Sequence, residues 1–112
     1  MKTIIVAFMA MFLTMFTNDV KAQYIPCTHS FTDFVLVAGG CDYLCECDYT
    51  FQIPTNLNPS LYNLEVWRNH VQQFNFGATP VHLAYGDIIC FYLKHPNNDI
   101  EECCFDVSDF CY

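Results

Sequence analysis

Basic residues are scarce in this sequence, and their scarcity excludes several functions. The 112 residues contain 4 lysines and arginines against 12 aspartates and glutamates, a formal net charge of −8. Nucleic-acid binding needs a basic surface to neutralise phosphates, and membrane-lytic peptides need a cationic face, so neither function fits this chain. The acidic balance instead favours a protein partner whose own surface is neutral or basic.

A hydrophobic run long enough to cross a membrane is also missing. The longest run, Ile4–Phe16, falls short of the ~20 apolar residues that a transmembrane helix needs. It follows a positively charged start and precedes a Val-x-Ala site that ends at Ala22, a pattern typical of a signal peptide. We therefore expect a signal peptide over residues 1–22, a single cysteine-rich secreted domain over residues 23–112, and no stable membrane insertion.

Recognisable catalytic and metal-binding motifs are absent as well. The sequence has no glycine-rich phosphate loop, nucleophile motif or Cys-x-x-Cys pair, and its 4 histidines lack the helical spacing of metal ligands. The C-terminal segment superficially resembles the active site of secreted phospholipases. Ser108 precedes Asp109 where that family has a histidine, so the general base is missing. We predict a protein that is not an enzyme and that uses no cofactor or metal.

Cysteine, by contrast, is abundant. Eight cysteines in a small secreted chain predict a disulfide framework, because an oxidising compartment pairs thiols before zinc binds them. Each bridge would add about 2–4 kcal/mol to a domain whose hydrophobic core is modest. The adjacent Cys103 and Cys104 would close a strained ring if they paired together; otherwise the spacing leaves the pairing open. The predicted disulfide-forming residues are Cys27, Cys41, Cys45, Cys47, Cys90, Cys103, Cys104 and Cys111.

Acidic side chains gather near the C-terminus, in a segment that three cysteines hold in place. We predict that these acids contact a basic partner. A calcium site and a plain solvated acidic tail are the alternatives, and the spacing matches no known calcium loop. The predicted binding residues are Asp99, Glu101, Glu102, Asp106 and Asp109.

Local patterns predict a small α+β domain. Apolar, β-prone segments at residues 31–38 and 49–53 predict strands, and residues 81–93 predict a hairpin that turns at Gly86-Asp87. One helix is predicted over about residues 59–75, with Trp67 buried on its apolar face. That face consists of Leu61, Leu64, Trp67, Val71 and Phe74, which recur at helical spacing. The predicted fold is a small disulfide-rich α+β domain with a short antiparallel sheet, one helix and a stapled C-terminal tail.

The cysteine order carries one resemblance. Cys27, the Cys41-x3-Cys45 step, Cys90 and the pair Cys103-Cys104 followed by Cys111 resemble small secreted arthropod proteins with a single von Willebrand factor type C-like domain. Such proteins occur as venom peptides and as immune-response proteins. Three-finger toxins share the same order but end in Cys-Asn.

The signal peptide, the short mature chain, the dense cysteines and the absence of a catalytic motif together favour a venom-type, toxin-like effector. Such a protein would act by binding a host protein, receptor or channel. An endogenous secreted immune or signalling protein is the alternative, and a secreted hydrolase with an unrecognised site is the second alternative.

Overall fold

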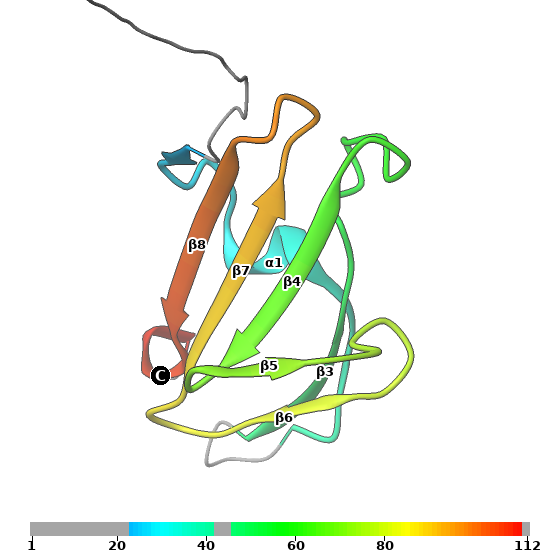
Figure 1. The fold of residues 1–112 in the computed structure, drawn as a ribbon. Helices are drawn as coiled ribbons and strands as arrows, with labels where there is room; N and C mark the ends of the chain where they lie inside the picture. Colours follow the sequence, from blue (N-terminus) through cyan, green and yellow to red (C-terminus); the bar gives the residue numbers. More distant parts are fainter. Residues whose placement is uncertain (1–22, 42–45, 111–112) are drawn as a thin grey trace, which may run out of the picture.

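The structure consists of two β-sheets that pack face to face. It is a computed structural model that describes residues 23–41 and 46–110. Figure 1 shows strands β8, β7 and β4 side by side, with helix α1 and strand β3 behind them. The expected signal peptide, Cys45 and Cys111 lie outside the described residues. Within the described part, no helix is long and apolar enough to span a membrane.

The larger sheet has five strands in the order β1-β8-β7-β4-β5. β7 pairs antiparallel with both β8 and β4, β5 pairs antiparallel with β4, and the short β1 runs parallel to β8 at the other edge. The bounds are β1 Tyr24–Ile25, β4 Asn63–Arg68, β5 Val71–Gln73, β7 Ile88–Lys94 and β8 Ile100–Asp106.

The smaller sheet has three strands in the order β2-β3-β6, all antiparallel. A single helical turn, α1, leads into it, and the Ser30 backbone N–H donates to the Asp33 carboxylate to cap that turn. A 3-10 turn, η1, follows β8. The bounds are α1 Phe31–Phe34, β2 Val35–Gly39, β3 Cys47–Phe51, β6 Val81–Leu83 and η1 Val107–Phe110.

The core lies between the two sheets and is rich in aromatic rings. Strand alternation turns Ile89, Phe91 and Leu93 of β7 inward, where all three are fully buried. Phe91 stacks on Phe34 of α1 with ring centroids 4.3 Å apart and meets Phe51 of β3 edge-on at 4.9 Å. These contacts join residues from both sheets and from the helical turn, so the two sheets fold as one unit.

The helix predicted over about residues 59–75 is wrong. This segment forms β4 and β5, joined by Asn69 and His70, whose φ angles of 48° and 67° give a two-residue type I′ hairpin turn. β4 pairs with β7 along its whole length and buries Val66 completely, and this tertiary pairing overrides the local helical spacing. Val71 and Phe74 are 62% and 72% exposed, so they do not pack with Trp67 as predicted.

The remaining fold predictions are confirmed only in part. The sheet-rich, disulfide-bonded character is confirmed. β3 covers most of the predicted strand at 49–53, whereas residues 31–38 split between α1 and β2. Residues 81–93 do contain two strands, but β6 and β7 belong to different sheets, so Gly86-Asp87 does not close a hairpin. The predicted stapled C-terminal tail contains strand β8, which two disulfides hold.

Three disulfides bind this frame together. Cys27–Cys103 ties the N-terminal segment to β8, Cys90–Cys104 crosses between β7 and β8, and Cys41–Cys47 spans the connection from β2 to β3. Because side chains alternate along β8, the adjacent Cys103 and Cys104 point to opposite faces and reach different partners. Every cysteine in residues 23–41 and 46–110 is therefore paired.

Candidate functional site

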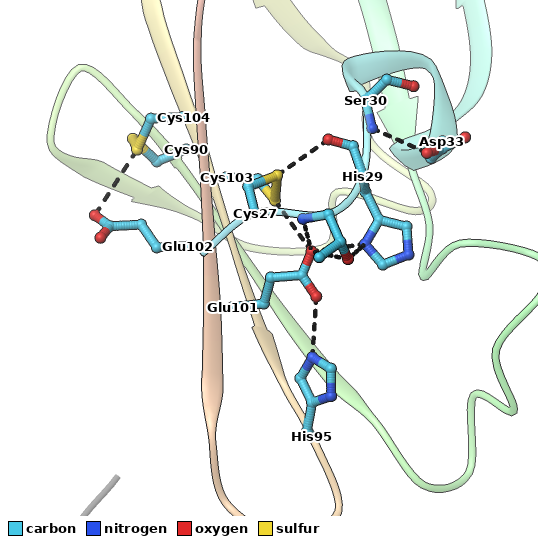
Figure 2. The surroundings of a disulfide bond; sticks show 11 residues. Cys27, His29, Ser30, Asp33, Cys90, His95, Glu101, Glu102, Cys103 and Cys104 are labelled. Atoms are coloured by element: carbon cyan, nitrogen blue, oxygen red, sulfur yellow. Dashed lines mark hydrogen bonds and ion pairs between the residues drawn. A yellow bond between two sulfur atoms is a disulfide. The ribbon is translucent and has the colours of Figure 1, made fainter. Parts of the chain in front are cut away.

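Strand β8 separates two neighbouring glutamates that the sequence does not distinguish. Glu101 is 1% exposed and points toward the core side, whereas Glu102 is exposed on the outer face of the sheet. Figure 2 shows the two side chains on opposite sides of the strand. The two residues therefore belong to two different clusters.

The first cluster is a buried carboxylate that receives four hydrogen bonds. Glu101 Oε2 accepts from the Thr28 backbone N–H at 2.7 Å, from the Thr28 hydroxyl at 3.0 Å and from His29 Nδ1 at 2.7 Å. His95 Nε2 donates to the other oxygen, Oε1, at 3.0 Å (Figure 2). Thr28 and His29 come from the N-terminal segment and His95 from the β7–β8 turn. One carboxylate thus joins three parts of the chain.

These donors decide the charge state of Glu101. Burial by itself raises the pKa of the Glu101 carboxyl, but hydrogen bonds from the Thr28 backbone, His29, His95 and the Thr28 hydroxyl outweigh it and hold the pKa below its usual value. Glu101 is therefore ionised at neutral pH. Each histidine then donates from the nitrogen that faces the carboxylate.

This cluster does not have the geometry of a catalytic triad. In such a triad the acid and the nucleophile contact different nitrogens of the histidine ring. Here Glu101 and the Thr28 hydroxyl both lie at His29 Nδ1, at 2.7 Å and 3.4 Å, and Thr28 donates directly to the carboxylate. The arrangement orients and fixes side chains, and it does not pass a proton from Thr28 through His29.

A metal centre at the same place is also disfavoured by chemistry. Cys27, Glu101 and Cys103 bring ligand-type atoms within 4.8 Å of one another. Cys27 and Cys103 are bonded to each other, however, and a disulfide sulfur lacks the thiolate charge that makes cysteine a metal ligand. A disulfide sulfur also carries no hydrogen, so the sulfur contacts drawn in Figure 2 are not hydrogen bonds donated by sulfur.

The second cluster covers the outer face of the five-stranded sheet. Strand register places Glu65, Tyr92 and Glu102 directly opposite one another on β4, β7 and β8. The next row consists of Trp67 beside the Cys90–Cys104 disulfide. Side chains in one row of a sheet lie within contact distance, so these two rows form one continuous surface.

Hydrogen bonds fix the aromatic rings of this face. Trp67 Nε1 donates to Glu65 Oε1 at 3.0 Å, and the Tyr92 hydroxyl donates to Glu102 Oε2 at 3.3 Å. The Trp67 and Tyr92 rings meet edge-to-face with centroids 6.4 Å apart. Burial, followed by the charge of Glu102, raises the pKa of the Tyr92 hydroxyl.

The outer face is hollowed and not flat. A hollow of about 640 Å³ lies over it, within the range of ligand-binding sites. Its wall includes Ile88, Ile100 and Tyr24, and Tyr24 is 62% exposed at the edge beside β8. Lys94 also lines the hollow, one row away from Tyr92. We take this hollow, with Glu65, Trp67, Tyr92 and Glu102, as the candidate functional site.

The five acids expected to bind a partner do not form one surface. Glu101 is buried, Glu102 lines the hollow, and Asp106 accepts from the backbone and hydroxyl of Ser108, which lowers its pKa. Asp99 precedes β8 and Asp106 ends it, so extended geometry places them roughly 20 Å apart. Asp109 is exposed in η1, beyond that end of the strand.

A third polar cluster lies on the smaller sheet. His82 of β6 contacts Asp48 of β3 through Nδ1 at 2.6 Å and Glu46 through Nε2 at 3.0 Å. Ionised carboxylates accept hydrogen bonds and favour the protonated ring, so the bonds to Asp48 and Glu46 raise the pKa of His82. This exposed ion cluster secures β6 to β3.

Sequence reasoning missed the outer face as a candidate site. It placed Trp67 in the core and did not single out Glu65 or Tyr92. The sequence signal that could have found them is spacing: Glu65 and Trp67 are two residues apart, as are Cys90 and Tyr92, so each pair lies on one face if the segment is a strand.

Comparison with known proteins finds no match: no family model, no curated protein and no solved structure is significantly similar to this chain.

Proposed function

We propose that this chain is a secreted, disulfide-stabilised effector of the venom type that acts by binding a protein, and that the outer face of the five-stranded sheet is its binding surface. The observation that carries the proposal is the hollow over Trp67 and Tyr92. Aromatic side chains of this kind anchor protein interfaces, because a large apolar surface can be buried while the polar end stays hydrogen-bonded.

The disulfide bonds support both the proposed extracellular location and the proposed action by binding. Disulfide-bonded small domains are compatible with extracellular secretion, since oxidising compartments preserve the bridges. Cleavage after Ala22 would leave β1 intact, because its pairing with β8 begins at the Gln23 carbonyl and Tyr24. The Cys90–Cys104 bridge lies in the floor of the hollow and keeps β7 and β8 from separating. A rigid floor lowers the ordering cost of binding.

The charge of the molecule supports a partner with a basic surface. The predicted mature chain has two basic against eleven acidic side chains, a formal charge of −9. Such a surface accelerates encounter with a basic partner, and added salt screens the attraction beyond about 10 Å at 0.1 M. The alternative, an endogenous immune or signalling protein, would use the same surface. A transcript restricted to a venom or salivary gland supports the venom-type effector.

The experiment compares two charge-insertion variants of the oxidised mature protein. Ile100→Arg places a cation in the hollow, and Leu36→Arg places one on β2, where Leu36 is 49% exposed. Each immobilised variant is used to capture partners from candidate target tissue, and the captured protein is purified and measured directly. We expect Ile100→Arg to lose the partner, Leu36→Arg to retain it, and the association rate to fall with added salt.

Two results overturn this proposal. Partner binding that survives Ile100→Arg removes the outer face as the binding surface. Turnover of a lipid, peptide or glycan by the purified protein removes binding as the mode of action and favours the secreted hydrolase.

A further inference from the structure

We infer, resting on the proposed function, that the hollow contains a subsite for the guanidinium group of an arginine side chain presented by the partner. Glu65 and Glu102 would supply the negative charge, and Tyr92 and Trp67 the aromatic surface. A guanidinium subsite is more specific than a preference for a neutral or basic partner, because one type of partner side chain would bind at one place on the sheet.

The first support is the row in which these residues lie. Tyr92 of β7 stands between Glu65 of β4 and Glu102 of β8 in direct cross-strand register. The two acidic backbone positions are therefore two strand spacings apart, roughly 10 Å. A cation seated over the Tyr92 ring has a carboxylate on each side of it.

The second support is how the carboxylates are held. Glu65 is fixed by the Trp67 indole N–H through Oε1, and Glu102 by the Tyr92 hydroxyl through Oε2. Within residues 23–41 and 46–110, no hydrogen bond reaches Glu65 Oε2 or Glu102 Oε1. One oxygen of each carboxylate thus accepts a hydrogen bond that orients the group, and the second oxygen can accept a hydrogen bond from a bound ligand.

The third support is the match between this chemistry and a guanidinium group. A guanidinium is planar, stacks on aromatic faces and donates several N–H groups in one plane, whereas an ammonium is a compact point charge. The Trp67 and Tyr92 rings meet edge-to-face, so a guanidinium group that stacks on one ring lies beside the other. An entirely apolar occupant would bury the two carboxylates without a cation, which is costly.

Lys94 does not fill this subsite in the structure. It lies in the row of Asn63 and Ile100, at the end of β7, and is exposed. Among the described residues, no ion pair joins Lys94 to Glu65 or Glu102. The row that contains Tyr92 is therefore acidic on both sides, and the Lys94 ammonium belongs to the neighbouring row.

The test uses Trp67 as its reporter, because it is the sole tryptophan of the chain. Its fluorescence is titrated with acetyl-Gly-Arg-Gly-amide and with the same peptide carrying citrulline, which keeps the shape and removes the charge. A lysine peptide is the third probe. We expect the arginine peptide to bind about tenfold more tightly than the citrulline peptide, the size of one cation–π contact plus one charged hydrogen bond.

The matched variants change charge without changing shape. Glu65→Gln combined with Glu102→Gln should abolish the preference for arginine over citrulline, while Asp109→Asn, an exposed acid outside the hollow, should preserve it. All three positions are exposed, so each substitution should alter stability by no more than about 0.5 kcal/mol.

Each outcome either supports or overturns the inference. Equal affinity for arginine and citrulline, or a preference that survives the double variant, overturns it. Equal affinity for lysine and arginine overturns the assignment to a guanidinium group. If the peptide tests fail but Ile100→Arg still abolishes partner capture, the guanidinium subsite is wrong and the proposed function is retained. If partner capture is insensitive to Ile100→Arg, the proposed function itself is wrong.

Discussion

Glu101 is a buried residue that keeps its charge. Its carboxylate is 1% exposed, yet it stays ionised because four donors surround it. Oε2 alone accepts three hydrogen bonds, two from Thr28 and one from His29. A buried charge of this kind contributes to stability only while all its partners remain in place.

Glu101→Gln should lower the free energy of unfolding by about 1.5–3 kcal/mol, the value of hydrogen bonds to a charged group. The amide has one acceptor oxygen, and its NH2 group would face a donor from the N-terminal segment or from His95. Denaturant unfolding with the disulfides intact measures the change. The matched control is Glu102→Gln, the same substitution at the next, exposed position, which should cost no more than about 0.5 kcal/mol.

The same carboxylate predicts a pH dependence. Because the folded pKa of Glu101 lies below its ordinary value of 4.5, its contribution to stability is complete above that pH and is lost as pH falls through the folded pKa. Asp87 and Asp106 also have lowered pKa values, so the wild type alone does not isolate Glu101. The difference in unfolding free energy between wild type and Glu101→Gln should therefore be constant near neutrality and shrink below about pH 4.5. A difference that grows on acidification contradicts an ionised Glu101.

At the scale of elements, the β4–β5 hairpin positions Trp67 and Glu65 for the candidate site. Asn69 connects this hairpin to the start of β7: its amide oxygen accepts from the Ile88 N–H at 2.9 Å, and its amide nitrogen donates to Asp87 at 2.8 Å. Arg68 donates to the other oxygen of Asp87 at 3.0 Å. Burial raises the pKa of Asp87, but the bonds from Asn69, the Ala84 backbone and Arg68 outweigh it and lower the pKa.

The turn residue His70 provides the test of this element. Its φ of 67° is a conformation that side chains other than glycine and asparagine adopt at a cost. His70→Gly should stabilise the fold by about 0.5–1 kcal/mol, and His70→Val should destabilise it by about 1 kcal/mol or more. Thermal unfolding of both variants measures the two shifts. Equal shifts for Gly and Val would contradict the type I′ turn, as would a strong helical signal by circular dichroism.

At the scale of the whole molecule, the disulfides differ in the length of chain that they close. The Cys27–Cys103, Cys90–Cys104 and Cys41–Cys47 bridges span sequence separations of 76, 14 and 6 residues. Closing a longer loop removes more conformational entropy from the unfolded chain. The chain-entropy relation then assigns about 4.5, 3 and 2 kcal/mol to the three bridges in that order.

Replacing each bridged pair by two alanines should therefore destabilise the protein most for Cys27–Cys103 and least for Cys41–Cys47. Denaturant unfolding of the three double variants gives the ranking, and a reversed order would contradict the pairing. The predicted absence of free thiols also covers Cys45 and Cys111, which lie outside the described residues. Thiol labelling under denaturing, non-reducing conditions should then find no reactive cysteine.

Composition by itself determined the disulfide-bonded, cysteine-rich character of this protein. The cysteine count predicted disulfides, and the three bridges confirm that character for six of the eight cysteines. The shortage of basic residues predicted that nucleic acid is not a partner, and this stays a prediction. These properties depend on side-chain chemistry summed over the chain, so they do not require knowledge of which segments meet.

Only the tertiary structure decided which residues face the core and which face the candidate site. The helical spacing around Trp67 was a local signal, and it was overridden because β7 offers β4 a partner along its whole length. Likewise, Glu101 and Glu102 are identical in sequence terms, yet the pleat of β8 sends one to four buried donors and the other to the outer face. Strand register is set by partners distant in the sequence, which is why it could not be read from the local pattern.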